Sequence, residues 1–250
     1  MANTQVSKTC ARKTGLRVQL PLLAQMSIRR FPTMKFSWTP ELAYAVGLIT
    51  TDGNLSKDKR HITFTSCDLD LLKTFKRCLK LNVKITKNPQ SFSTIRQCFR
   101  LQFSNVHFYD WLVKIGLKPN KTFKLTSLSV PDNFFPDFVR GHLDGDGSVI
   151  TYIDRYLVTK NPKYIYKRLM VYLMSASHLH IEWLQRKISN LTNLHGAIQV
   201  KKHRLRKNPI YVLKFSKKES ILLLKWIYYK EDLPCLKRKY NIAKEFLSFN

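Results

Sequence analysis

Two aspartates, Asp52 and Asp146, have the side-chain type and the local setting that could do chemistry in this 250-residue chain. Each follows an apolar stretch with helical spacing, and each precedes a glycine that permits a sharp exit from the helix. The carboxyl end of a helix has unpaired carbonyls and partial negative charge, so an aspartate there is unfavourable by itself. One Asp-Gly pair would indicate only a turn. Two copies indicate that a cation occupies the helix ends.

The predicted cation is a hard divalent metal ion. If the two helices pack side by side, both carboxylates meet at their base, and Gly47 and Gly141 allow the backbones to approach closely. Carboxylate and backbone oxygens, without sulfur or imidazole, suit Mg²⁺, with Mn²⁺ as a substitute. Such a metal activates a water and stabilises the leaving oxygen in phosphodiester hydrolysis.

The motif around each aspartate is part of a longer internal repeat. Glu41–Gly53 (ELAYAVGLITTDG) matches Phe135–Gly147 (FPDFVRGHLDGDG) position by position, and Ser66–Asp68 matches Ser175–Ser177. Helices are predicted near 39–50, 68–80, 105–115, 178–191, 218–229 and from Leu236, and strands near 60–66, 82–87, 96–104, 169–176, 196–202, 209–216 and directly after Gly147. Each half therefore has the order helix, two strands, helix, two strands, helix, which predicts a duplicated α+β fold.

We place the boundaries of the repeat between the predicted elements. The first half covers 38–128 and the second half 129–250, after a basic N-terminal arm at 1–37. The chain has no acidic residue before Glu41. A loosely ordered arm, which we favour, competes with an upstream extension from a misjudged start (Met26 and Met34 are available) and with an organelle transit peptide.

The charge of the chain predicts a polyanionic partner. Lys and Arg number 44 against 16 Asp and Glu, a net charge of +28, whereas an ordinary soluble surface mixes both signs. Nucleic acid is the commonest such partner. No apolar run approaches the roughly 20 residues that span a bilayer, which disfavours a membrane protein. We expect an intracellular protein that acts on DNA, in the cytoplasm, the nucleoid or an organelle matrix, and is not secreted.

Alternation along the predicted strands gives candidate DNA contacts. One face of each sheet is apolar, and the other presents basic and amide side chains, which suit base edges and phosphates in the major groove. The alternative is a plain solvated sheet face. The candidates are Lys84, Arg96, Arg100 and Gln102 in the first half and Gln199, Lys201, Lys202, Arg204 and Lys214 in the second.

The five cysteines carry no motif. Their number is odd and no pair has CxxC spacing, which argues against a zinc site and against a disulfide framework. We therefore expect isolated thiols in a reducing compartment.

The two motif stretches are similar to a known family. AVGLITTDG at 45–53 and VRGHLDGDG at 139–147 resemble the two motifs of a single-chain LAGLIDADG homing endonuclease, and the resemblance extends over about residues 38–248. The first motif departs at Thr50, where the family often has an acid. The resemblance implies two pseudo-symmetric αββαββα halves, with the motif helices at their interface and two antiparallel sheets forming a DNA-binding saddle.

The resemblance also implies roles for pairs of residues, one from each half. The pairs are the metal ligands Asp52 and Asp146, the assisting carbonyls of Thr51 and Gly145, the lysines near the scissile phosphate, Lys121 and Lys239, and a supporting polar position, Asp68 and Ser177.

The activity implied by the resemblance is a staggered double-strand break in a long, asymmetric DNA site, made by a monomer that is intron-encoded or free-standing. Two other functions stay open. One is an intron RNA maturase, with host intron RNA as partner, or a non-cleaving DNA-binding protein on the same scaffold. The other is a basic ribosome-associated protein without catalysis.

Overall fold

The computed structural model describes residues 36–88, 97–156, 158–202 and 208–247. The chain divides into two units, Met1–Met34 and Lys35–Asn250, and everything below concerns the second. The predicted arm at 1–37 lies almost wholly outside the described residues, as do the candidate DNA contacts Arg96 and Arg204. In the described part of the chain, no helix is long and apolar enough to cross a membrane.

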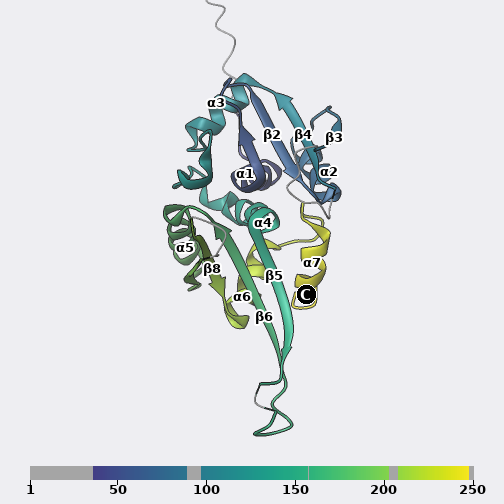
Figure 1. The fold of residues 1–250 in the computed structure, drawn as a ribbon, viewed down its shortest axis with the longest axis vertical. Coiled ribbons are helices and arrows are strands. Elements are labelled where there is room, and N and C mark those ends of the chain that lie inside the picture. Colours follow the sequence, from purple (N-terminus) through teal and green to yellow (C-terminus); the bar gives the residue numbers. More distant parts are fainter. Residues whose placement is uncertain (1–35, 89–96, 157, 203–207, 248–250) are drawn as a thin grey trace, which may run out of the picture. The chain divides into compact units, whose positions relative to one another are not determined.

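The described chain confirms the predicted α+β fold, with two successive sets of helices and strands (Figure 1). The first set is α1 (Pro40–Asp52), β1 (Gly53–Leu55), β2 (His61–Ser66), α2 (Leu69–Cys78), β3 (Ile85–Lys87), β4 (Phe99–Ser104) and α3 (Val106–Lys114). The second is α4 (Phe135–Asp146), β5 (Gly147–Asp154), β6 (Tyr166–Ser175), α5 (His178–Thr192), β7 (Ala197–Lys201), β8 (Ile210–Phe215), α6 (Lys217–Ile227) and α7 (Lys237–Lys244). Two short 3₁₀ turns, η1 (Lys121–Phe123) and η2 (Asp132–Phe134), lie between the sets. The half boundaries 38–128 and 129–250 stay a prediction.

Each set forms one four-stranded antiparallel sheet. The strand orders are β1-β2-β4-β3 and β5-β6-β8-β7, so the two sheets repeat one topology. Strand β1 was implied by the predicted order of elements but was not assigned to residues, because the first strand located in the sequence of that half was 60–66. It has three residues, too few to give a recognisable alternation of apolar and polar side chains.

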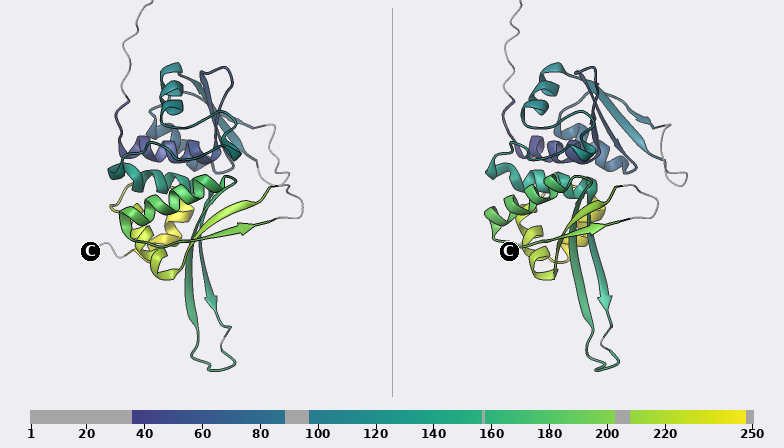
Figure 2. Two further views of the ribbon diagram at one scale, coloured as in Figure 1. Left: turned by 90° about the vertical axis from the view of Figure 1, so that its left-hand side faces the viewer. Right: turned by 60° about the vertical axis from the view of Figure 1, so that its left-hand side comes forward.

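The helices α1 and α4 lie side by side between the two sheets (Figures 1 and 2). The side chain of Thr39 accepts a hydrogen bond from the backbone N–H of Leu42, which caps the start of α1. A Cβ added to Gly47 would lie 2.8 Å from the backbone nitrogen of His142, and one added to Gly141 would lie 3.1 Å from the Cα of Gly47. The two glycines therefore allow the close backbone approach that the sequence predicted.

One face of each sheet packs into the hydrophobic core. In the first sheet the core side chains are Ile62, Phe64, Leu101 and Phe103, and in the second they are Val149, Leu169, Val171, Leu173, Leu213 and Phe215. Side chains alternate between the two faces of a strand, so the intervening residues lie on the opposite face. Most of these are half-buried or exposed. We call this opposite face the open face of each sheet.

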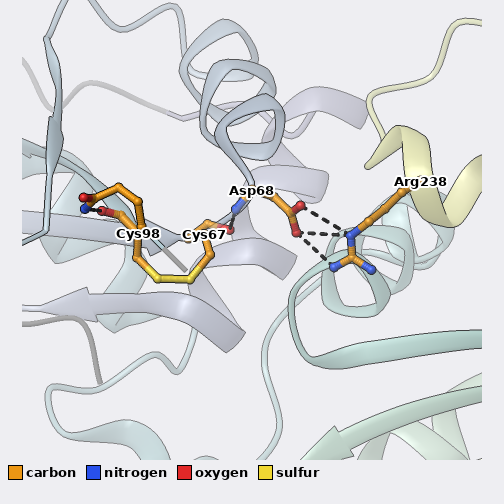
Figure 3. The surroundings of a disulfide bond; sticks show 6 residues. Cys67, Asp68, Cys98 and Arg238 are labelled. Atoms are coloured by element: carbon orange, nitrogen blue, oxygen red, sulfur yellow. Dashed lines mark hydrogen bonds and ion pairs between the residues drawn. A yellow bond between two sulfur atoms is a disulfide. The ribbon is translucent and has the colours of Figure 1, made fainter. Parts of the chain in front are cut away.

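The cysteines correct one expectation, because Cys67 and Cys98 form a disulfide (Figure 3). Ser66 at the end of β2 pairs with Phe99 at the start of β4. Cys67, which follows Ser66, and Cys98, which precedes Phe99, therefore face each other, with their Cα atoms 3.9 Å apart. The prediction of no disulfide was wrong because it considered only spacing along the chain and not pairing across strands. Cys78 and Cys235 are free thiols.

Candidate active site

The two aspartates lie at the ends of the paired helices. Asp52 is the last residue of α1 and Asp146 the last of α4, and each chain continues directly into a strand. A Cβ added to Gly145 would lie 3.1 Å from Oδ2 of Asp52 and 2.7 Å from Cβ of Thr51. The Asp52 carboxylate therefore rests against the end of α4, at the residue before Asp146.

The two glycines that follow the aspartates are needed because a larger residue would clash with the preceding helical turn. Gly53 has φ −82° and Gly147 has φ −110°, an extended conformation open to other residues. A Cβ added to Gly53 would lie 2.6 Å from the carbonyl oxygen of Ile49, and one added to Gly147 would lie 2.6 Å from that of Leu143. The sharp exit from each helix therefore needs glycine because the new strand starts against the preceding helical turn.

The surroundings disfavour charge on both carboxylates. Burial raises the pKa of Asp52 to about 7, and the nearby charge of Asp146 adds to the effect, while Lys121 and Lys239 oppose it. Partial desolvation also raises the pKa of Asp146, again opposed by the two lysines. The Asp146 side chain is open to a cavity of about 560 Å³ that Thr51 and Lys121 also line. A bound cation would relieve the repulsion between the two carboxylates.

Each lysine implied by the resemblance binds the carboxyl end of one motif helix. The Lys121 ammonium, on η1, donates to the carbonyls of Thr51 (2.9 Å) and Gly53 (2.5 Å). The Lys239 ammonium, on α7, donates to three carbonyls, those of Leu143 (2.6 Å), Asp144 (2.9 Å) and Gly147 (2.6 Å). Burial lowers the pKa of each lysine to about 8, and the neighbouring aspartates oppose that shift.

Asp68 and Ser177 make contacts that cross between the two halves. Asp68 precedes α2 and accepts a 2.9 Å hydrogen bond from Nη2 of Arg238 (Figure 3). Ser177 precedes α5, and its hydroxyl donates to the carbonyl of Leu125 at 2.5 Å. Arg238 adjoins Lys239, and the Leu125 backbone N–H bonds to the Lys121 carbonyl. The side chains of Asp68 and Ser177 thus contact the segments that carry the two lysines.

Asp144 is a site residue that the sequence interpretation missed. Its Oδ2 accepts hydrogen bonds from the Tyr44 hydroxyl (2.8 Å) and from the backbone N–H of Leu236 (2.7 Å). Leu236 is the residue directly before α7, so its backbone hydrogen bond connects the buried Asp144 to the helix that carries Lys239. The available signal was the repeat, in which Asp144 stands where the first motif has Thr50.

The candidate DNA contacts within the described residues lie on the open faces or directly beside a strand. Arg100 pairs with Thr65 and Thr86, and Gln102 pairs with Thr63, away from the core residues Leu101 and Phe103. In the second sheet Gln199, Lys201 and Lys214 pair with Val212, Ile210 and Tyr172, respectively. Lys84 precedes β3 and Lys202 follows β7.

Comparison with known proteins identifies the fold. No protein-family model and no curated protein sequence matches the chain. The structure of the homing endonuclease I-WcaI bound to its DNA recognition sequence matches at 14% identity, 93% coverage of this chain, 96% coverage of that chain and a TM-score of 0.55. The I-LtrWI LAGLIDADG homing endonuclease bound to target DNA matches at 14% identity, with 83% and 89% coverage and a TM-score of 0.53.

Full-length DUF199/WhiA from Thermatoga maritima is similar at 16% identity and a TM-score of 0.49, and the match covers 87% of this chain and 65% of that protein. The two sheets and the paired helix ends define a two-motif LAGLIDADG scaffold. The chain has the fold of the LAGLIDADG homing endonucleases, as its motifs predicted.

Proposed function

We propose that the protein is a site-specific DNA endonuclease that makes a staggered double-strand break with a divalent metal ion. The observation that carries this proposal is the meeting of two Asp-Gly helix ends, with the Asp52 carboxylate against Gly145. The net charge of +28 supports a nucleic-acid substrate. Homing endonucleases with the same fold are bound to DNA in their structures. One chain supplies both motif helices, so we propose that it acts as a monomer.

The donor set fits a hard cation. Within the described residues, no group of three or more His, Cys, Asp or Glu side chains is placed to hold a metal ion. Asp52 and Asp146 would instead hold Mg²⁺ or Mn²⁺ together with backbone, water or phosphate oxygens. The Thr51 carbonyl already accepts a hydrogen bond from Lys121, whereas the Gly145 carbonyl is not an acceptor of Lys239. When bound, the ion supplies activation of a water and stabilisation of the leaving oxygen.

The lysines act on the charge of the phosphodiester. With a pKa of about 8, each of Lys121 and Lys239 is largely protonated at pH 7. A positive charge held at the base of each motif helix stabilises the negative charge that develops on a phosphate placed there. Two such centres, one in each half, would act on one phosphate of each DNA strand.

The test is the conservative replacement of each aspartate. Asp52→Asn and Asp146→Asn should each abolish Mg²⁺-dependent double-strand cleavage of a target obtained by selection from random DNA, while DNA binding persists. Asp110→Asn, at an exposed position on α3, is the matched control and should cleave normally. Full cleavage by either variant would overturn the two-aspartate mechanism. Specific binding without any cleavage by the unaltered protein would instead indicate a non-cleaving DNA-binding protein.

A further inference from the structure

The open faces of the two sheets differ in chemistry. In the first sheet the open face offers groups that form hydrogen bonds, from Asn54, Thr63, Thr65, Thr86, Arg100 and Gln102. In the second sheet the part of the open face on β5 and β6 is largely apolar or aromatic, with Ile150, Tyr152, Met170, Tyr172 and Met174, while Gln199, Lys201 and Lys214 lie on β7 and β8. The same topology therefore presents two different recognition surfaces.

The apolar character does not arise from core packing. Ile150 pairs with Met170, one step from the core pair formed by Val149 and Val171. Ile150 and Tyr152 are each 45% exposed, which is high for large apolar side chains. These side chains continue along the β5–β6 hairpin, which extends beyond the helices (Figure 2). Exposed apolar side chains that form a patch mark a binding surface.

Two polar side chains of β6 on this face, Tyr172 and Arg168, already have protein partners. The Tyr172 hydroxyl donates to the sulfur of Met170 at 2.9 Å. Arg168 donates to the Asp154 carboxylate at 2.9 Å, and its guanidinium lies over the ring of Tyr166. These side chains therefore present mainly methyl, thioether and ring surface to an incoming ligand.

The position of the surface and its charged surroundings point to DNA as the ligand. Ser148 on the open face follows the candidate metal ligand Asp146 by two residues, so DNA at the aspartates would continue over β5. Lys201, whose ammonium lies 5.4 Å from the centre of the Tyr172 ring, and Lys214 supply positive charge beside the apolar patch. The apolar group that base edges present in the major groove is the C5-methyl of thymine.

We propose that the second sheet recognises its half of the target through thymine methyl groups packed against Ile150, Met170 and Tyr152. The first sheet recognises its half through hydrogen bonds. This inference rests on the proposed function, since it takes the bound ligand to be a specific duplex. It predicts a half-site rich in contacted thymines under β5 and β6.

The test replaces thymine with deoxyuridine, which removes the methyl group and keeps the hydrogen-bonding edge. Thymines of each half-site of the selected target are replaced separately, and binding is measured by fluorescence anisotropy in Ca²⁺ so that cleavage is not needed. Each buried methyl should account for about fourfold in affinity. Replacing two contacted thymines should therefore weaken binding about sixteenfold in one half-site, with little change in the other.

A double variant assigns the effect to the second sheet. Ile150→Ser with Met170→Gln should bind thymine and deoxyuridine targets equally in that half-site, whereas Leu222→Ser, at a 46% exposed position on α6, should keep the full difference. Specific binding with no deoxyuridine effect, or an equal effect in both half-sites, overturns the inference and leaves the endonuclease proposal standing. Absence of specific DNA binding overturns both. A concentration-dependent dimer that the double variant abolishes would show that the patch binds a second copy instead.

Discussion

The two halves hold their candidate active-site lysines in different ways. Lys121 lies on a single 3₁₀ turn and contacts two carbonyls, whereas Lys239 lies on a helix and contacts three. The start of that helix is tied to Asp144. The corresponding Thr50 bonds within its own helix, to the carbonyl of Val46 at 2.7 Å. The duplication is therefore maintained at the aspartates but not in the structure that supports them.

The second motif helix also has buried polar side chains where the first has apolar ones. The repeat aligns Arg140 with Val46 and His142 with Leu48. Arg140 is fully buried and donates to the carbonyls of Ile227, the last residue of α6, and of Pro234, which lies between α6 and α7. The second half thus uses α4 to position the helix α7, where the described residues of the first half have the 3₁₀ turn η1. Stability in the second half should depend on specific hydrogen bonds more than in the first.

The largest expected difference in stability loss between the two halves is for substitutions at the aligned positions Arg140 and Val46. Arg140→Leu leaves the buried Asp137, its 2.6 Å partner, without its cation, and loss of one partner of a buried pair lowers stability by about 3–5 kcal/mol. Val46→Ala removes only apolar volume and should lower it by about 1–2 kcal/mol. Urea denaturation measures both. Equal losses would show that the buried arginine has no special structural importance.

A pH-dependent difference is expected from two buried histidines. His142 and His180 stack with ring centres 5.3 Å apart, where the repeat places Leu48 and Leu71 in the first half. Burial lowers the pKa of His142 well below its usual value and that of His180 to about 4. Both are neutral in the folded protein. Their contribution to the free energy of unfolding is therefore complete above the pKa of an unfolded histidine, near 6.5, and is lost as the pH falls toward about 4.

A double variant that replaces both histidines with leucine, the residue at the aligned positions of the first half, tests this pH dependence. His142→Leu with His180→Leu should remove a loss of about 3 kcal/mol from His180 between pH 6.5 and 4, together with the further loss from His142. The measurement is the difference in unfolding free energy between variant and unaltered protein at each pH, in which contributions of unchanged carboxylates cancel. Leu71→Met, a conservative change at the aligned core position, is the control. Parallel pH profiles would contradict the assignment.

A smaller difference is expected at Asp144 and Thr50. Asp144→Ala leaves the Tyr44 hydroxyl and the Leu236 N–H without their acceptor and should lower stability by about 2–3 kcal/mol. Thr50→Ala removes one bond within a helix and should lower it by less than about 1 kcal/mol. Cleavage of end-labelled strands adds a second readout, because loosening of α7 should slow the strand served by Lys239 more than the other. Equal slowing of both strands would count against separate support for the two lysines.

The sequence predicted the repeated parts of this molecule and missed the parts that distinguish the halves. Helix periodicity and the duplicated Asp-Gly ends gave the fold and brought out Asp52 and Asp146 as candidates. The hydrogen bonds that position α7 in the second half could not be predicted in this way, since Asp144 and its partner Leu236 are 92 positions apart. The disulfide between Cys67 and Cys98 depends likewise on strand pairing. Such contacts are set by how elements pack and leave no local pattern in the chain.

The smallest expected effect on stability is at the exposed contact between the halves, the pair of Asp68 and Arg238. Surface ion pairs contribute about 0–1 kcal/mol and are screened by salt. Asp68→Asn should therefore change the unfolding free energy by less than about 1 kcal/mol, and by less still in high salt. Ser177→Ala removes the buried counterpart, a hydroxyl bonded to the Leu125 carbonyl, and should have the larger effect.

The two positions should also differ in which DNA strand they affect. Arg238 adjoins Lys239, so Asp68→Asn should slow the strand that Lys239 serves, whereas Ser177→Ala should slow the strand that Lys121 serves. Asp70→Asn, near Asp68 in sequence but in an ion pair with Lys73 on its own helix, is the control for the first variant. Opposite strand preferences would establish that each half positions the lysine of the other. If both variants slowed the same strand, Asp68 and Ser177 would not be equivalent positions of the repeat.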